Sequence, residues 1–258
     1  MVKFTLTGGI MTLQTQGLAS TSDIDIGRVV RGTFDVVRAR LPDLAWLAVA
    51  FVFVPTLLTG FLPPKTPYSV SALANLPGLI FDGAAALLAY NHLTSGPALT
   101  GSVAMSQAMR KFGALWGLGI ISGLATILGL VLLVVPGVIL MVGWMASTSV
   151  LMIENLKVTE SLDRAWKLSA GQRWRLAGLL GITVAGGAGG FLVLIVIMMV
   201  VQLAASEALA NQALDFVLTP LFVSVLSVFT AVGASAAYVE LRTAKEGVVG
   251  GAVAEIFA

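Results

Sequence analysis

The sequence predicts an all-α integral membrane protein with six transmembrane helices. Of its 258 residues, 57% are hydrophobic and only 11% are charged, whereas an ordinary soluble domain has about 25% charged residues. The apolar stretches are continuous rather than alternating, which favours helices over a transmembrane β-barrel. With six crossings, 14 of the 15 Lys and Arg residues lie on one side of the membrane. This is the charge distribution of the cytoplasmic side.

The six spans are predicted from apolar runs long enough to cross about 30 Å of hydrocarbon. They cover residues 44–62, 70–93, 112–135, 138–153, 176–204 and 214–238. Pro55 predicts a kink in the first span. The second span reaches sufficient length only when it is extended back past Pro77, and it is the most polar of the six. Pro136 and Gly137 predict a tight turn between the third and fourth spans.

Three short amphipathic helices are expected on the cytoplasmic side, near residues 26–41, 102–112 and 154–175. In the third, Glu160 with Arg164 and Asp163 with Lys167 are four residues apart, a favourable spacing for ion pairs on a helix. Each amphipathic segment leads into a Trp-bearing span and a hairpin. This pattern is compatible with a pseudo-threefold repeat of hairpins or with a chance match.

The predicted domain organisation is simple. A flexible segment (1–22) precedes one membrane domain (23–242), and a short tail (243–258) follows it. Because the number of spans is even, both termini are expected in the cytoplasm. The composition and charge pattern therefore predict a multi-pass membrane protein with its N- and C-termini on the cytoplasmic side.

One region resembles a known family. It contains Pro136-Gly137, a short span ending at Glu154, and the segment ESLDRAWKLSAGQRWR, in which Leu162, Leu168 and Gly171 fit the family pattern. The chain resembles the membrane domain attached to some bacterial glycerophosphoryl diester phosphodiesterases, and related small inner-membrane proteins of unknown function. In this pattern Ser161 replaces the usual Ala and Ala165 the usual Ser. The upstream DIGRVVRGTFDVVRARLPDLAWLAVAFVFVP is also similar, so the resemblance covers roughly residues 23–242.

The resemblance implies placement in a bacterial cytoplasmic (inner) membrane and a link to membrane-lipid or envelope metabolism. It does not imply catalysis. The family's phosphodiesterase activity belongs to a separate barrel domain with paired His residues and metal-binding carboxylates, and this chain has one His. We therefore expect no enzymatic activity, no catalytic or metal-binding residues and no cofactor. With no Cys, the chain has no disulfide or Cys nucleophile, and a net charge of +2 gives no reason to expect nucleic-acid binding.

Two carboxylates are candidates for a polar membrane site. Asp82 is the one carboxylate well inside a predicted span, and an ionisable residue there is a functional hypothesis by default. Its alternative interpretation is a hydrated or protonated group near the outer boundary. His92 lies ten residues further on and off the same face, so the two do not form a local pair. Glu154, at the cytoplasmic end of the fourth span, is expected to pair with Arg164 or Arg173, or else to bind a ligand.

Two further sets of residues are candidates for contacts with lipid and between helices. Basic side chains beside the membrane attract anionic phospholipids of the cytoplasmic leaflet. The candidate headgroup contacts are Lys157, Arg164, Lys167, Arg173 and Arg175. Small residues inside spans favour close helix packing. The candidates for such packing are Gly119, Gly123, Gly186 and Gly190.

Three functions of different classes remain. The sequence favours a non-catalytic accessory or scaffold protein of a lipid or envelope system, bound to the bilayer and to a possible membrane protein partner. The alternative is a small-solute or lipid transporter or channel with a polar site near Asp82. Its other polar candidates are scattered along the chain: Asn91, Ser122, Thr126, Ser147, Thr148 and Gln202. A membrane-embedded lipid enzyme ranks last, because no catalytic constellation is evident.

Overall fold

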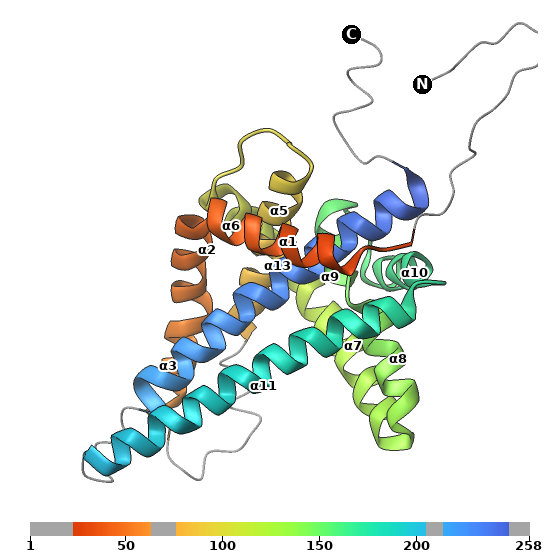
Figure 1. Ribbon diagram of the computed structural model, residues 1–258. Coiled ribbons are helices and arrows are strands. Elements are labelled where there is room, and N and C mark those ends of the chain that lie inside the picture. Colours follow the sequence, from red (N-terminus) through yellow and green to blue (C-terminus); the bar gives the residue numbers. More distant parts are fainter. Residues whose placement is uncertain (1–22, 63–75, 205–213, 248–258) are drawn as a thin grey trace, which may run out of the picture.

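The computed structural model describes residues 23–62, 76–204 and 214–247. The predicted N-terminal segment, the loop with Lys65, the first part of the second span (70–75) and most of the C-terminal tail lie outside the described residues. All regular secondary structure in the described part is helical (Figure 1).

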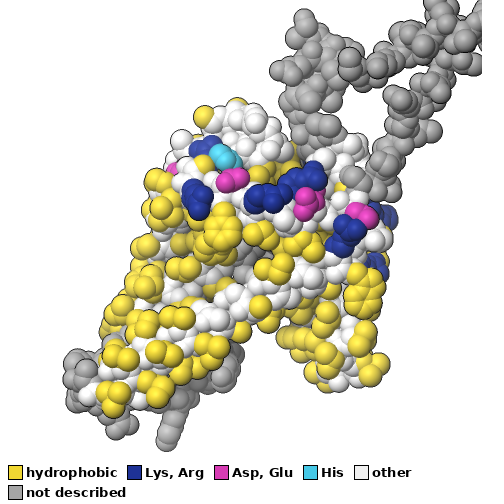
Figure 2. Space-filling model, viewed as in Figure 1, with side chains coloured by type: hydrophobic (Ala, Val, Ile, Leu, Met, Phe, Trp, Pro, Cys, Tyr) yellow, Lys and Arg dark blue, Asp and Glu magenta, His cyan; other side chains and the backbone are white. Residues whose placement is uncertain are grey.

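Three amphipathic helices lie at one end of the molecule, as predicted. They are α1 (Ile26–Ala39), α6 (Gly101–Arg110) and α10 (Val158–Ser169). Each buries residues spaced three or four apart, as α1 does with Val29, Thr33 and Val36. Figure 2 shows the charged side chains gathered in a band over this end, with an apolar surface beyond it. The end that carries α1, α6 and α10 is called the charged end below.

The first predicted span is a continuous but irregular helix. It consists of α2 (Leu41–Ala48), a π-helical turn η1 (Val49–Phe53) and α3 (Val54–Thr59). Pro55 lacks the N–H that would bond to the carbonyl of Phe51, so the regular helical ladder is interrupted here. The irregularity expected at Pro55 is therefore present as a π-helical turn directly before it.

The third predicted span and the first part of the fourth form a tight hairpin of α7 (Phe112–Leu132) and α8 (Val134–Trp144). The predicted turn at Pro136-Gly137 is wrong by about three residues, because the chain turns at the extended residue Leu133 (φ −159°, ψ 133°). Pro136 sits in the first turn of α8, where a missing N–H costs no helical bond. A Cβ on Gly137 would lie 2.4 Å from Leu130 Cγ, so glycine is needed for the close contact of the two helices.

A short break at Met145 and Ala146 separates α8 from α9 (Ser147–Ile153). Lys111, between α6 and α7, donates from Nζ to the carbonyls of Leu151 (3.0 Å) and Met152 (3.4 Å). The last carbonyls of a helix lack partners within it. Lys111 therefore ties the end of α9 to the start of α7, and burial lowers the pKa of this amine.

The two longest helices are α11 (Arg173–Ala204) and α13 (Thr219–Glu246), the latter preceded by a π-helical turn η2 (Leu214–Leu218). They lie close together around Gly187 and Gly190 and diverge towards the charged end (Figure 1). α13 ends at Glu246, so residues 243–246, predicted as part of the tail, are helical. A Cβ on Gly190 would lie 2.8 Å from the Phe222 ring, which confirms close packing at this glycine.

The other predicted packing glycines behave differently. A Cβ on Gly119 would lie 3.7 Å from the Leu79 side chain, an ordinary contact. At Gly123 and Gly186 the prediction of close packing is wrong for the described residues, since nothing lies within 4 Å of a Cβ built there. Gly123 faces a groove described below, and Gly186 lies on an exposed face of α11.

Helix α5 (Leu76–Leu93) is the central element of the molecule. Phe81, Ala84, Ala85, Leu88 and Ala89 are completely buried. The helix packs against α1, α6, α7, α9 and α13. Its alanines and Gly83 are small enough for the neighbouring helices to pack closely against it. Protein, rather than lipid, therefore covers most of α5.

Five of the described helices are long and apolar enough to cross a membrane. They are Leu41–Thr59, Phe112–Leu132, Val134–Ile153, Arg173–Leu203 and Phe216–Glu246. The described part of the predicted second span, α5, is not among them. The chain is thus an all-α protein with the helices of a multi-pass membrane protein, while the sixth crossing and the threefold repeat stay predictions.

Candidate polar membrane site

Asp82 lies in the second turn of α5 and borders three cavities. Their volumes are about 190, 180 and 50 Å³. These three spaces are called the Asp82 cavities below. Asp82 is 11 residues before Leu93 at the charged end, which corresponds to about 16 Å along the helix axis.

Hydroxyl side chains from four other helices line the Asp82 cavities. They are Thr56 of α3, Ser122 of α7, Ser147, Thr148 and Ser149 of α9, and Ser227, Thr230 and Ser235 of α13. Two of them contact each other, with Ser149 Oγ 3.0 Å from Ser235 Oγ. Ser122 donates to the carbonyl of Leu118 at 2.6 Å. Hydroxyls can donate or accept, so these walls can solvate a polar ligand.

The fold brings together part of the polar set predicted from the sequence. Ser122, Ser147 and Thr148 lie around Asp82, and Thr126 lies in an adjoining groove. Asn91 instead donates from Nδ2 to the carbonyl of Pro97 at 2.6 Å, beyond the other end of α5. Gln202 is exposed near the end of α11.

Sequence reasoning missed the contribution of α13, together with Ser149 of α9 and Thr56 of α3. Ser227 and Thr230 are three residues apart, which places them on one face of a helix, and Ser235 lies five residues further along the chain. That periodicity was available in the sequence. The sequence pattern does not show that α5 is central in the fold. It therefore could not show that these residues of α13 face Asp82.

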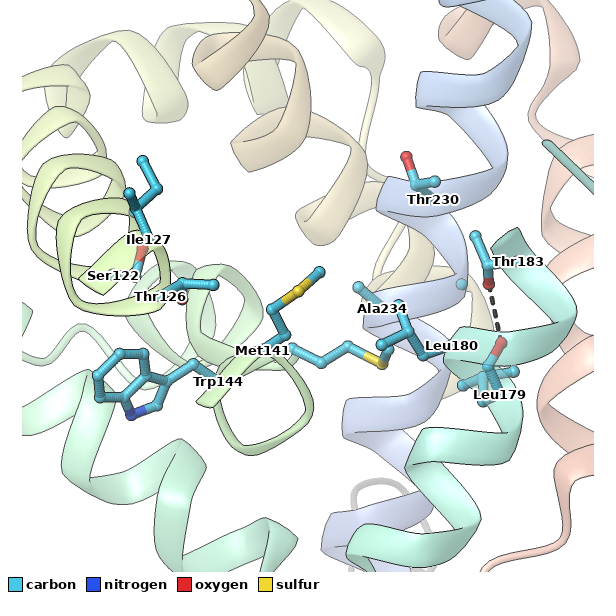
Figure 3. Close-up of a pocket in the computed structure, with 13 residues that line it drawn as sticks. Ser122, Thr126, Ile127, Met141, Trp144, Leu179, Leu180, Thr183, Thr230 and Ala234 are labelled. Carbon is cyan, nitrogen blue, oxygen red and sulfur yellow. Dashed lines mark hydrogen bonds between the residues drawn. The ribbon is translucent and has the colours of Figure 1, made fainter. Parts of the chain in front are cut away.

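A larger groove lies between the α7–α8 hairpin and the α11–α13 pair, with a volume of about 460 Å³. Figure 3 shows Ser122, Thr126 and Trp144 on one side, Thr183, Thr230 and Ala234 on the other, and Met141 between them. Ile127 is 59% and Met141 41% exposed, so the groove opens to the surface. The groove is lined by Ser122, Gly123, Thr126, Ile127, Met141, Trp144, Met145, Leu179, Leu180, Thr183, Thr230, Gly233 and Ala234.

Glu154 belongs to a different cluster, at the charged end. Its carboxylate accepts from Arg164 Nε at 3.0 Å and from the Tyr238 hydroxyl at 2.9 Å. Arg164 also binds Glu246, which pairs with Arg242 at 3.0 Å. The predicted pairing of Glu154 with Arg164 is confirmed. Burial opposes the charge of Arg164, but hydrogen bonds to Glu154 and Glu246 raise the pKa of the guanidinium.

The predicted pair of Glu160 with Arg164 does not form. Glu160 instead accepts from the backbone N–H of Lys157 at 3.1 Å, at the start of α10. An acidic side chain in a first helical turn is well placed to bond a free backbone donor. The predicted pair of Asp163 with Lys167 is present.

The candidate headgroup residues have contacts within the protein. Arg175 pairs with Asp23 and donates to the carbonyl of Ile24 at 2.9 Å. Arg173 lies over the Trp166 ring, 3.7 Å from its centroid. Arg164 is held as described above, and Lys157 is exposed at the start of α10. Lys167 pairs with Asp163, so four of the five candidates have intramolecular contacts.

An exposed Trp marks the same end of the molecule. Trp174, in the first turn of α11, is 92% exposed. Trp side chains are enriched where a membrane meets water. The pattern agrees with an interface at the charged end.

Comparison of the chain with protein-family models, with curated proteins and with solved structures found no match. Within the described residues, no group of three or more His, Asp or Glu side chains is placed to hold a metal ion.

Proposed function

We propose that this protein is a multi-pass membrane transporter that binds a positively charged small solute or ion at Asp82. One observation carries the proposal: a carboxylate on the central helix borders three cavities walled by hydroxyls from four other helices. An isolated charge in a low-dielectric interior is costly, so intramembrane carboxylates commonly mark ion or substrate paths. A cation is the ligand that compensates the charge of Asp82.

The proposed setting is a bacterial cytoplasmic membrane with the charged end inside. The distribution of basic residues and the band of charge at one end support it. Both termini are then cytoplasmic, and a crossing that includes residues 70–75 and α5 supplies the sixth span. Asp82 lies between the two surfaces in this arrangement.

The accessory role in lipid or envelope metabolism, with anionic phospholipids or a membrane protein as partner, is the second candidate. It rests on the sequence resemblance. The buried polar site around Asp82 favours transport, because a scaffold has no need of a carboxylate that lines internal cavities.

Charge movement across proteoliposomes tests the proposal. The purified protein is placed in phosphatidylcholine vesicles on a solid-supported membrane and exposed to jumps of Na⁺, K⁺, methylammonium or tetraphenylphosphonium. We expect a current with at least one of these cations that Asp82→Asn abolishes. The exposed surface carboxylate Asp163 supplies the matched control, and Asp163→Asn should keep the current. Currents of equal size in Asp82→Asn, or none with any cation, would contradict the proposal.

A further inference from the structure

The groove and the Asp82 cavities are neighbours. Met145, Thr230 and Ala234 line both the groove and the 180 Å³ cavity, and Ser122 lines both the groove and the 50 Å³ cavity. These four side chains therefore border both the large apolar groove and a cavity that Asp82 lines. Three of them are small.

Met145 is suited to act as a movable partition. It lies at the break between α8 and α9 rather than inside a regular helix. Its unbranched thioether side chain adopts many shapes at little cost. It is the flexible side chain among those that line both the groove and the cavity beside Asp82.

The chemistry of the two spaces differs in a way that defines a ligand. The groove offers Leu179, Leu180, Ile127, Met141 and Trp144, with hydroxyls at its edges. Among the described residues that line the groove and the Asp82 cavities, Asp82 is the only ionisable one. One space suits an apolar body, and the other suits a positive charge.

We infer that the ligand is an amphipathic organic cation, whose apolar body occupies the groove while its charged group faces Asp82. This inference rests on the proposed function and names its substrate class. The groove volume of about 460 Å³ lies within the range of about 300–1,000 Å³ typical of small-molecule sites. Because the groove opens to the apolar surface, such a ligand enters from the bilayer.

Calorimetric titration in phosphatidylcholine nanodiscs tests the inference with two probes of the same shape. Tetraphenylphosphonium carries a positive charge and tetraphenylborate a negative one. The wild-type protein should bind the phosphonium saturably and the borate not at all. Asp82→Asn should weaken phosphonium binding by at least about tenfold, because the ligand's buried charge loses its partner.

A second variant tests the groove separately. Nothing lies within 4 Å of a Cβ built on Gly123, which lines the groove, so Gly123→Phe can occupy the groove without displacing a helix. It should weaken phosphonium binding by at least about tenfold through loss of the apolar contact. Gly186, equally open but on an exposed face of α11, gives the control Gly186→Phe, which should bind normally.

The outcomes separate the two proposals. Phosphonium affinity that is unchanged in Gly123→Phe, with methylammonium currents still dependent on Asp82, would overturn the inference and leave the proposed function standing. Equal saturable binding of both probes would overturn it as well. If no cation, small or large, depends on Asp82, both proposals fail.

Discussion

Asp82 and Glu154 are both carboxylates in a largely apolar chain, but their surroundings give them different tasks. Glu154 accepts from Arg164 and Tyr238 and so joins α10 to α13. Asp82 borders open space. The first arrangement stabilises the fold, and the second is available to a ligand.

This difference predicts opposite effects of two substitutions. Glu154→Ala leaves the buried Tyr238 hydroxyl without its acceptor and should lower the free energy of unfolding by about 1–3 kcal/mol, with cation affinity retained. Asp82→Asn should change stability by less than about 1 kcal/mol while cation binding is lost. Denaturant unfolding in detergent and calorimetry measure the two quantities. Loss of stability only in Asp82→Asn would reverse the assignment.

Gly143 is a second residue whose role depends on its surroundings. A Cβ at this position would lie 2.4 Å from Cε3 of Trp166. The guanidinium of Arg173 lies over the same Trp166 ring. Gly143→Ala should therefore displace α10 from α8 and lower the free energy of unfolding by roughly 1–3 kcal/mol.

The matched control for Gly143 is Gly181, where nothing lies within 4 Å of a Cβ. Gly181→Ala should be neutral or stabilise the helix by up to about 1 kcal/mol. Equal unfolding midpoints for the two variants would show that the contact of Trp166 with Gly143 has no energetic weight.

The contact between α11 and α13 depends on a few positions. Gly190 meets Phe222 and Gly187 meets Leu226, while most of the remaining surface of α11 is exposed. Gly190→Leu should separate the two helices and reduce stability by roughly 1–3 kcal/mol.

A pair of engineered cysteines reports this separation, since the chain has none of its own. Cysteines at Gly187 and Leu226 should crosslink readily in an otherwise wild-type background and slowly with Gly190→Leu. Gly186→Leu, on the exposed face, should not alter the rate. Unchanged crosslinking in both variants would mean that Gly190 does not set the distance between the helices.

Helices were predictable from the sequence where local patterns decide them. Apolar runs gave the long helices, and Val29, Thr33 and Val36 show the spacing that made α1 recognisable. The turn at Leu133 was missed because Pro136 is equally acceptable in a first helical turn. Helix α13 continues to Glu246 because Arg164 and Arg242 hold that carboxylate.

The site was predictable only in part. Asp82 stood out as an ionisable residue in an apolar stretch, and Ser122, Ser147 and Thr148 were among the polar candidates. Their convergence depends on α5 lying between α7, α9 and α13, a tertiary arrangement with no local signature. The partner of Arg175, Asp23, is 152 residues away in sequence and was equally out of reach.

The membrane arrangement of the entire chain makes a prediction of its own. With the charged end inside and six crossings, a cysteine replacing Lys157 should react with a membrane-impermeant maleimide only in inside-out vesicles. One replacing Lys65 should react only from the outside of intact cells. Labelling of both positions from the same side would mean an even number of crossings between them, rather than the predicted three spans.

That prediction reduces to a count of spans between the two positions. Residues 70–93, 112–135 and 138–153 lie between Lys65 and Lys157, and three crossings place them on opposite sides. If α5 does not cross, two spans remain and both cysteines react from one side. Same-side labelling therefore removes the sixth span, and opposite-side labelling supports it.

Infrared difference spectroscopy of the carboxyl group of Asp82 tests the central claim most directly. Protein in phosphatidylcholine nanodiscs is recorded before and after addition of tetraphenylphosphonium. The Asp82 site predicts a change in a carboxyl stretching band that persists in Asp163→Asn and disappears in Asp82→Asn. A carboxyl band that does not respond to the cation, or that responds equally in Asp82→Asn, would show that the ligand does not reach Asp82.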